Sequence, residues 1–272
     1  MASCGLLNLA SCLPEAFFNY IASFLNAPLQ PLLDLAKNLI SLPVNIQLFS
    51  GLWAIVIYIL SMFYALLIIY NGFQFIISGY DIQKRENAKT WLRNILIMIV
   101  LVQASFFIYD LAIQVSAVMT STTLSLINNN FFLLTIDNIS NVALEIIFFM
   151  LYIIVLLCAV LILIIRYGIV AIGVVLFPIA IFFYFIQPLR SYGILILNFL
   201  GICMFTTFLD AIILTGFSKL VEISLFANIK ILVMISAFGL ICAMMFFLMF
   251  FSIIKAAMNL GTKIAAIAAT FA

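Results

Sequence analysis

The sequence predicts an all-α membrane protein, a polytopic helical bundle of about five spans. Three observations support this fold class. Hydrophobic residues make up 68% of the 272 residues and charged residues 7%, whereas soluble domains have about 45–50% apolar and about 25% charged residues. Several continuous apolar runs exceed the roughly 20 residues that a helix needs to cross a membrane. These runs also lack the alternation of apolar and polar residues that is typical of membrane β-barrels.

The first 48 residues are expected to form an external region without a span, because prolines divide it into short pieces. Within it, residues 31–42 place leucine, isoleucine and alanine on one side of a helical wheel and Asp34, Lys37 and Asn38 on the other. This pattern predicts an amphipathic helix that lies in the membrane interface or packs as a lid on the bundle. Cys4 and Cys12 either form a disulfide, if this end faces an oxidising exterior, or remain free thiols.

The transmembrane bundle is predicted to cover residues 49–255, followed by an alanine-rich cytoplasmic tail at 256–272. Gly79 and Asp81 mark the end of the first span and the start of a charged helix. Polar side chains inside the spans, among them Ser105 and Gln114, are interpreted as hydrogen-bond partners within the bundle. The five predicted spans are residues 51–78, 94–119, 142–165, 191–215 and 231–254.

The segment 167–187 has two interpretations, a re-entrant hairpin or a sixth span. Gly173 and Pro178 lie within it and Pro188 closes it, and an interrupted backbone is tolerated at membrane depth only against protein or water. Because cytoplasmic loops collect Lys and Arg, the cationic window at 81–93 is expected inside the cell and the N-terminus outside. The hairpin then places more cations inside than a sixth span does, so we favour it, with a cytoplasmic C-terminus.

Two sets of charged residues are candidates for function. The acids Asp110, Glu145 and Asp210 are expected inside or near the spans, where carboxylates are costly and often functional. The second set consists of cations expected to face the cytoplasm, where they contact anionic lipid, a protein partner or DNA phosphates: Lys84, Arg85, Lys89, Arg93, Arg166 and Arg190. The sequon at Asn138 falls in a loop expected outside and is a candidate glycosylation site.

No pattern in the sequence indicates an enzyme. The chain has no histidine, and no nucleotide-binding loop, catalytic triad or cysteine-pair motif is present. We therefore predict neither a cofactor nor a metal site.

One segment carries a family resemblance. It begins with the end of a span, Phe75-Ile76-Ile77-Ser78-Gly79-Tyr80-Asp81, and continues as Lys84-Arg85-Glu86-Asn87-Ala88-Lys89-Thr90-Trp91-Leu92-Arg93-Asn94. It is similar to a recurrent segment of type IV secretion membrane subunits. Over about residues 50–255 the chain resembles the CedA-like membrane subunits of archaeal DNA import systems and, more distantly, the TrbL-like channel subunits of bacterial conjugation.

The resemblance implies a multi-pass subunit of a cell membrane that forms or lines a DNA translocation channel. It also implies two kinds of partner, small pilin-like membrane subunits and a cytoplasmic ATPase of the HerA/VirB type, and a homo-oligomer is compatible with it. Two other functions stay open at this point. One is a secondary transporter of a small solute that uses Asp110, and the other is a membrane scaffold for a surface filament.

Overall fold

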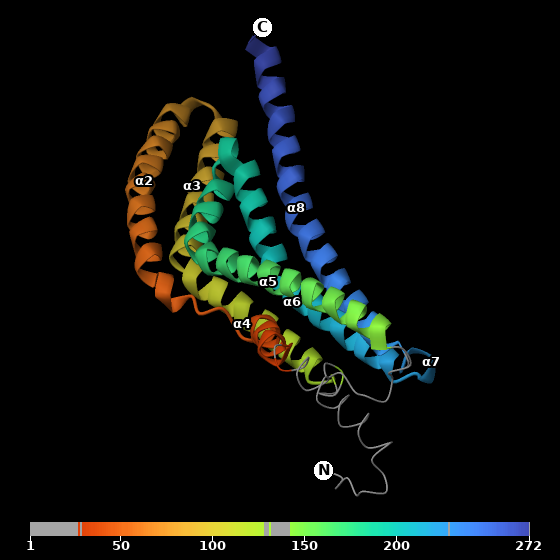
Figure 1. Ribbon diagram of the computed structural model, residues 1–272. Helices are drawn as coiled ribbons and strands as arrows, with labels where there is room; N and C mark the ends of the chain where they lie inside the picture. Colours follow the sequence, from red (N-terminus) through yellow and green to blue (C-terminus); the bar gives the residue numbers. More distant parts are fainter. Residues whose placement is uncertain (1–26, 28, 128–130, 132–141, 228, 272) are drawn as a thin grey trace, which may run out of the picture. The chain divides into compact units, whose positions relative to one another are not determined.

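The computed structural model describes residues 27, 29–127, 131, 142–227 and 229–271. Within these ranges all regular secondary structure is helical, which confirms the all-α part of the predicted fold class (Figure 1). Four helices are long and apolar enough to cross a membrane, and a fifth crossing results if one bent pair of helices counts as a single span. The described part of the chain is therefore consistent with a multi-pass membrane protein.

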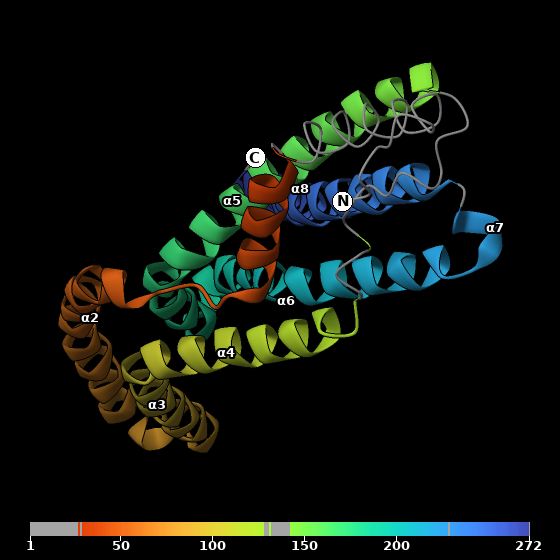
Figure 2. The same ribbon diagram turned by 60° about the horizontal axis from the view of Figure 1, so that its bottom comes forward.

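The first span is helix α2, Ser50–Ile77, which matches the predicted bounds closely. A 3₁₀ turn at Ser78–Tyr80 leads into α3, Ile82–Gln103, and α4, Ser105–Leu124, follows at a bend of 59°. Helices α2 and α3 lie side by side as a hairpin in both ribbon views (Figures 1 and 2). The second predicted span is thus made of the end of α3 and most of α4.

Helix α5, Val142–Phe185, runs without interruption through 44 residues and contains Pro178. At 1.5 Å per residue it is about 66 Å long, roughly twice the thickness of the hydrocarbon core. The predicted third span and the segment 167–187 belong to this one helix, so the re-entrant hairpin is not confirmed. The chain reverses direction later, at the 3₁₀ turn Gln187–Leu189, which contains Pro188.

Three helices complete the chain. Helix α6, Arg190–Val221, starts directly after the turn, and the short α7, Ser224–Ala227, leads into α8, Lys230–Phe271. The spanning part of α8 ends at Phe251. The last two predicted spans therefore correspond to α6 and to the first half of α8.

The described residues pack into two compact units. Unit 1 draws on the described residues within 1–42, 117–165 and 207–246, and unit 2 on those within 43–116, 166–206 and 247–272. Helices α4, α5, α6 and α8 each contribute to both units. The two units therefore do not follow the predicted domain boundaries, because each contains part of the bundle expected at 49–255.

Unit 1 has one apolar core, to which α5, α6 and α8 contribute Tyr152, Leu156, Leu214 and Phe238. Residues 29–41 form a helix that buries Leu33, Ala36 and Ile40 in this core and leaves Asp34 and Asn38 exposed. The predicted amphipathic segment thus packs its apolar side on protein, which is the lid interpretation.

Unit 2 has two apolar clusters. One joins α4, α5 and α6 around Tyr109, Val174 and Leu200, and the other joins α2, α3 and the end of α5 around Leu60, Met98 and Phe182. At Gly193 in α6, an added Cβ would lie 2.4 Å from the backbone nitrogen of Tyr184 and 2.6 Å from the carbonyl oxygen of Ala180. A glycine at this position therefore lets α6 pass directly against the end of α5.

Candidate functional site

The cationic window forms the exposed turn between α2 and α3. The Asp81 carboxylate accepts hydrogen bonds from the backbone nitrogens of Gln83 (3.0 Å) and Lys84 (3.3 Å) and so caps α3, as its position predicts. Lys84, Arg85, Lys89 and Arg93 are all exposed on the first turns of α3. The window therefore presents several cations on one short, well-defined helix start.

Some of these charges are paired locally. Lys89 Nζ lies 2.7 Å from Glu86 Oε1, and this contact holds the pKa of the Glu86 carboxyl below its usual value. The guanidinium of Arg85 lies over the Phe75 ring at 5.5 Å from its centroid. The window contains four cations against the two acids Asp81 and Glu86, so it keeps a net charge of +2 despite these pairs.

The turn between α5 and α6 lies at the same end of unit 2 as the turn between α2 and α3 (Figure 1), and Arg190 is the first residue of α6 after it. The guanidinium of Arg190 lies 5.1 Å from the centroid of the Tyr184 ring. Phe185 and Ile186, beside this turn, pack in the same apolar cluster as Trp91 from the start of α3. We call the five exposed cations Lys84, Arg85, Lys89, Arg93 and Arg190 the cationic end of unit 2.

Arg166 does not belong to this end, which corrects its grouping with the exposed cations. It lies near the middle of α5 and is 5% exposed. Its Nε donates to the carbonyl oxygen of Cys203 at 2.7 Å, and its Nη2 donates to that of Met204 at 3.1 Å, both in α6. The sequence placed Arg166 at a membrane surface because it ended the predicted third span, but the helix continues past it.

The carbonyl of Met204 joins three helices of unit 2. Besides Arg166 it accepts a hydrogen bond from the hydroxyl of Ser116 in α4, at 2.7 Å. Nearby, the Tyr109 hydroxyl donates to the Val170 carbonyl at 2.7 Å, and Gly173 faces this hydroxyl so closely that a Cβ would clash with it. This buried hydrogen-bond group holds α4, α5 and α6 together, and it suits a structural role because its donors point to backbone oxygens.

The sequence alone does not identify Tyr109 or Ser116 as members of this buried hydrogen-bond group. Hydroxyl residues are common in spans, and which backbone carbonyl each one reaches depends on the helix packing. Ser105 was expected to bond within the bundle, and it accepts a hydrogen bond from Trp53 Nε1 in α2 at 2.9 Å. The recurring presence of hydroxyls at the start and middle of α4 is the signal that could have found the group.

The three predicted acids have different surroundings. Asp110 is partly exposed on α4 and accepts a hydrogen bond from Gln114 Nε2 of the same helix at 2.6 Å. Asp210 is fully buried on α6 in unit 1, close enough to Cys242 to interact with it electrostatically. Glu145 belongs to the first turn of α5, and its side chain lies outside the described residues. The structure thus does not gather these acids into one site.

The remaining residues singled out in the sequence also lie in different surroundings. Gly173 and Pro178 are buried inside α5, and Pro188 is exposed in the following turn. Cys4, Cys12 and Asn138 lie outside the described residues, so the disulfide and the glycosylation site stay predictions. Within the described ranges, no three metal-binding side chains of the Cys, Asp or Glu type come together.

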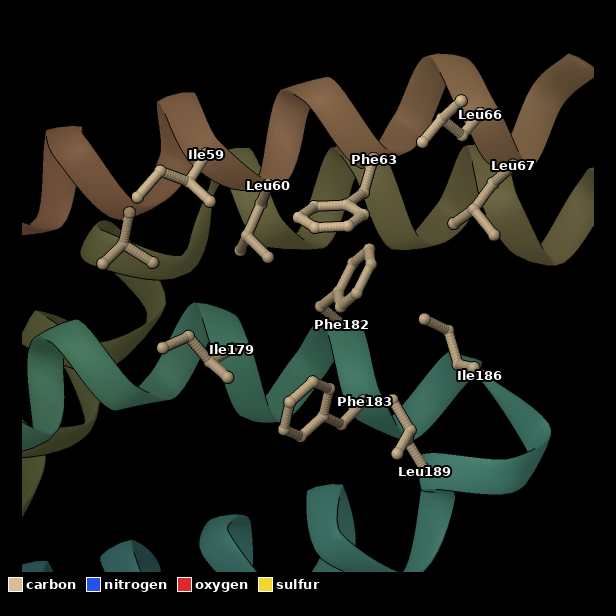
Figure 3. A pocket seen from close by; sticks show the side chains of 11 residues that line it. Ile59, Leu60, Phe63, Leu66, Leu67, Ile179, Phe182, Phe183, Ile186 and Leu189 are labelled. Carbon is tan, nitrogen blue, oxygen red and sulfur yellow. The ribbon is translucent and has the colours of Figure 1, made fainter.

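Unit 2 also contains an apolar cavity of about 480 Å³ between α2 and the end of α5. Figure 3 shows Phe63 and Leu67 of α2 facing Phe182 and Ile186 across it. No pattern in the sequence predicts this cavity, because both helices are apolar around their whole circumference.

Comparison of the chain with family models, with curated proteins and with solved structures gives no match. The function proposed for this chain therefore depends on its own residues and their arrangement.

Proposed function

We propose that this chain is a polytopic membrane subunit of a type IV secretion-like machinery for DNA transfer or import. The observation that carries the proposal is the cationic end of unit 2. Two separate turns of the chain contribute exposed cations there, and one of them is the segment that resembles type IV secretion subunits. The long apolar helices support the assignment to a membrane.

The charge pattern supports a cytoplasmic position for the cationic end. Lys and Arg accumulate in cytoplasmic loops, and four of the five cations lie on the first turns of α3, directly after the turn where α2 and α3 meet. With five crossings, this orientation has the N-terminus outside and the C-terminus inside. DNA would then meet the cationic end at the cytoplasmic face, where guanidinium groups suit phosphate oxygens.

The spans themselves offer DNA few cations. Among the described residues inside the apolar helices, Arg166 is committed to carbonyl oxygens of α6. A single chain is thus poorly suited to surround DNA, and we propose that it lines the conduit together with further copies or with small pilin-like subunits. A cytoplasmic ATPase of the HerA/VirB type would dock at, or deliver force near, the cationic end.

The proposal is tested with the double variant Arg85→Gln/Arg93→Gln, which leaves Lys84, Lys89 and Arg190 in place to maintain orientation. In cells that depend on this chain, we expect DNA uptake to fall. For the purified chain in lipid nanodiscs with a short DNA duplex, the dependence of log affinity on log salt concentration should lose about one unit of slope per removed contact.

Two controls accompany the double variant. Arg85→Lys/Arg93→Lys keeps the charge and should retain most of the salt dependence, and Lys219→Gln removes a cation of unit 1 and should change neither readout. Protease protection of a C-terminal tag verifies orientation. Normal DNA uptake in a correctly inserted double variant, with an unchanged salt slope, would exclude a DNA-contacting role for the window. Loss of surface filaments with intact uptake would favour the scaffold function instead.

A further inference from the structure

Two cysteines of unit 1 lie on helices that pack against each other. Cys158 belongs to α5 and Cys242 to α8, and both thiols are free. The Tyr152 ring of α5 packs edge-on against the Phe238 ring of α8, with the two ring centroids 5.9 Å apart. This contact fixes which turns of the two helices are neighbours shortly before each cysteine.

A second contact lies about one helical turn further along both helices. The Cys242 thiol donates to the carbonyl oxygen of Val155 in α5, with 3.8 Å between sulfur and oxygen. Residues three positions apart in an α-helix lie on the same face, and Cys158 is three positions after Val155. Cys242 therefore packs against the turn of α5 that carries Cys158, and the two thiols lie close enough to interact directly.

The two thiols differ in accessibility. Cys158 is exposed, whereas Cys242 is half-buried against the apolar core of unit 1. A reagent therefore reaches Cys158 first, and Cys242 is placed to attack the group that forms on it. An exposed thiol beside a second, resolving thiol is an arrangement in which oxidation ends in a reversible disulfide.

The surroundings favour a disulfide over a bound metal ion. Among the residues that the structure describes, no further Cys, Asp or Glu completes a metal-binding group of three with this pair. Metal binding would also require ionised thiolates, and charge is costly in an apolar site. A disulfide is neutral, so it adds no charge between α5 and α8.

We propose that Cys158 and Cys242 form a redox pair, which an apolar small-molecule disulfide converts into a disulfide bond between α5 and α8. First, the Cys158 sulfur attacks the reagent, forms a mixed disulfide and releases one reagent thiol, which carries away the Cys158 proton. The Cys242 sulfur then attacks the Cys158 sulfur and releases the second reagent thiol with the Cys242 proton. Two electrons and two protons thus pass from the pair to the reagent.

The experiment treats the full chain in lipid nanodiscs with dipyridyl disulfide, an apolar reagent that releases a coloured thiopyridone. Cys4 and Cys12 are first replaced by Ser, and Cys203 is buried in unit 2 and should stay unreacted. We expect release of about two thiopyridones per chain, with no pyridyl group left on Cys158. Mass spectrometry without reduction should find a peptide of α5 joined to one of α8, and a reducing agent should separate them.

Variants of Cys242 test the role of its position. Cys242→Ser removes the resolving thiol, so Cys158 should keep its pyridyl group and release should fall to about one thiopyridone per chain. The matched control Cys242→Ser/Ala243→Cys keeps both thiols but turns one of them by about 100° around α8, to an exposed position. This control should keep a pyridyl group on each thiol and give no joined peptide.

Three results would overturn the proposal. The first is a stable pyridyl group on Cys158 while Cys242 is present, with no peptide that joins α5 to α8. The second is an equal amount of joined peptide in the matched control, because the position of Cys242 would then be irrelevant. The third is a disulfide between two copies of the chain through Cys158. The site goes beyond the proposed function in DNA transfer, and these readouts contain no DNA, so they are independent of that test.

Discussion

Units 1 and 2 contain similar amounts of apolar helix but are held together differently. The core of unit 1 consists of side chains such as Leu156, Phe238 and Met245 that meet across three helices. Unit 1 also has part-buried hydrogen bonds between helices, from the Thr215 hydroxyl to the Thr123 carbonyl and from the Cys242 thiol to the Val155 carbonyl. In unit 2 the hydrogen bonds centred on Arg166 and Tyr109 are buried, and the backbones of α5 and α6 approach closely at Gly193. Inside a membrane, lipid is as apolar as leucine, so polar contacts and small residues specify helix packing better than apolar burial does. The difference lies in burial: the polar contacts that join α4, α5 and α6 in unit 2 are buried, and those of unit 1 given above are part-buried.

The largest expected effect comes from reversing the buried charge of unit 2. Arg166→Glu replaces two donors with a carboxylate that faces the carbonyl oxygens of Cys203 and Met204. An uncompensated buried charge costs about 3–5 kcal/mol or more, so we expect little folded protein by size-exclusion chromatography of a fluorescent fusion. Arg190→Glu, at an exposed position, should fold normally. Equal yields of the two variants would contradict the structural role of Arg166.

A smaller effect is expected from a substitution that obstructs the close contact between α5 and α6. Gly193→Ala puts a Cβ against backbone atoms of Tyr184 and Ala180, which cannot move as a flexible side chain would. Overpacking costs about 1–3 kcal/mol, and thermal unfolding in detergent should shift to lower temperature. In the same helix, Gly201→Ala meets no atom within 4 Å and should be neutral or slightly stabilising. A higher melting temperature for Gly193→Ala would refute the close approach.

The smallest effect compares one buried tyrosine in each unit. Tyr109 and Tyr152 are both fully buried, but the Tyr109 hydroxyl donates to Val170, whereas the structure gives the Tyr152 hydroxyl no hydrogen-bond partner among the described residues. Tyr109→Phe should cost about 1 kcal/mol, a decrease of about 2–4 °C in melting temperature. Tyr152→Phe should be neutral or stabilising. The same change in both variants would remove the distinction between the units.

The all-helical class and the starts of α2, α5, α6 and α8 were predictable because they depend on local properties of the chain. The apolar run that became α2 is bounded by residues whose preferences act within one helical turn, and Asp81 caps α3 because its carboxylate reaches nitrogens two and three residues ahead. The same applies to the exposed cations of α3. The cationic end of unit 2 was only partly predictable, since the packing of Phe185 and Ile186, beside the α5–α6 turn, with Trp91 of α3 depends on how α5 returns toward α2.

A span was predicted to end at residue 165, whereas α5 continues to Phe185. This difference has a clear physical origin. Arg166, Gly173 and Pro178 each interrupt an apolar run, and in an isolated helix in lipid each would be unfavourable. In unit 2 neighbouring helices compensate for two of them: α6 offers carbonyl oxygens to Arg166, and the Tyr109 side chain packs against Gly173. These compensations come from residues 37 or more positions away, so no local pattern could reveal them.

The sequence by itself determined that this chain is helical, that it is apolar enough for a membrane, and which short helix carries most of its exposed cations. Composition and periodicity are enough for these properties, because they depend on the transfer of side chains from water and on contacts within one turn. Only the tertiary structure decided that Arg166 is buried, that α5 continues through Pro178, and that an apolar cavity lies between α2 and the end of α5. Each of these depends on which helices pack together, and in a chain that is apolar on almost every face that choice is made by a few distant polar and small residues.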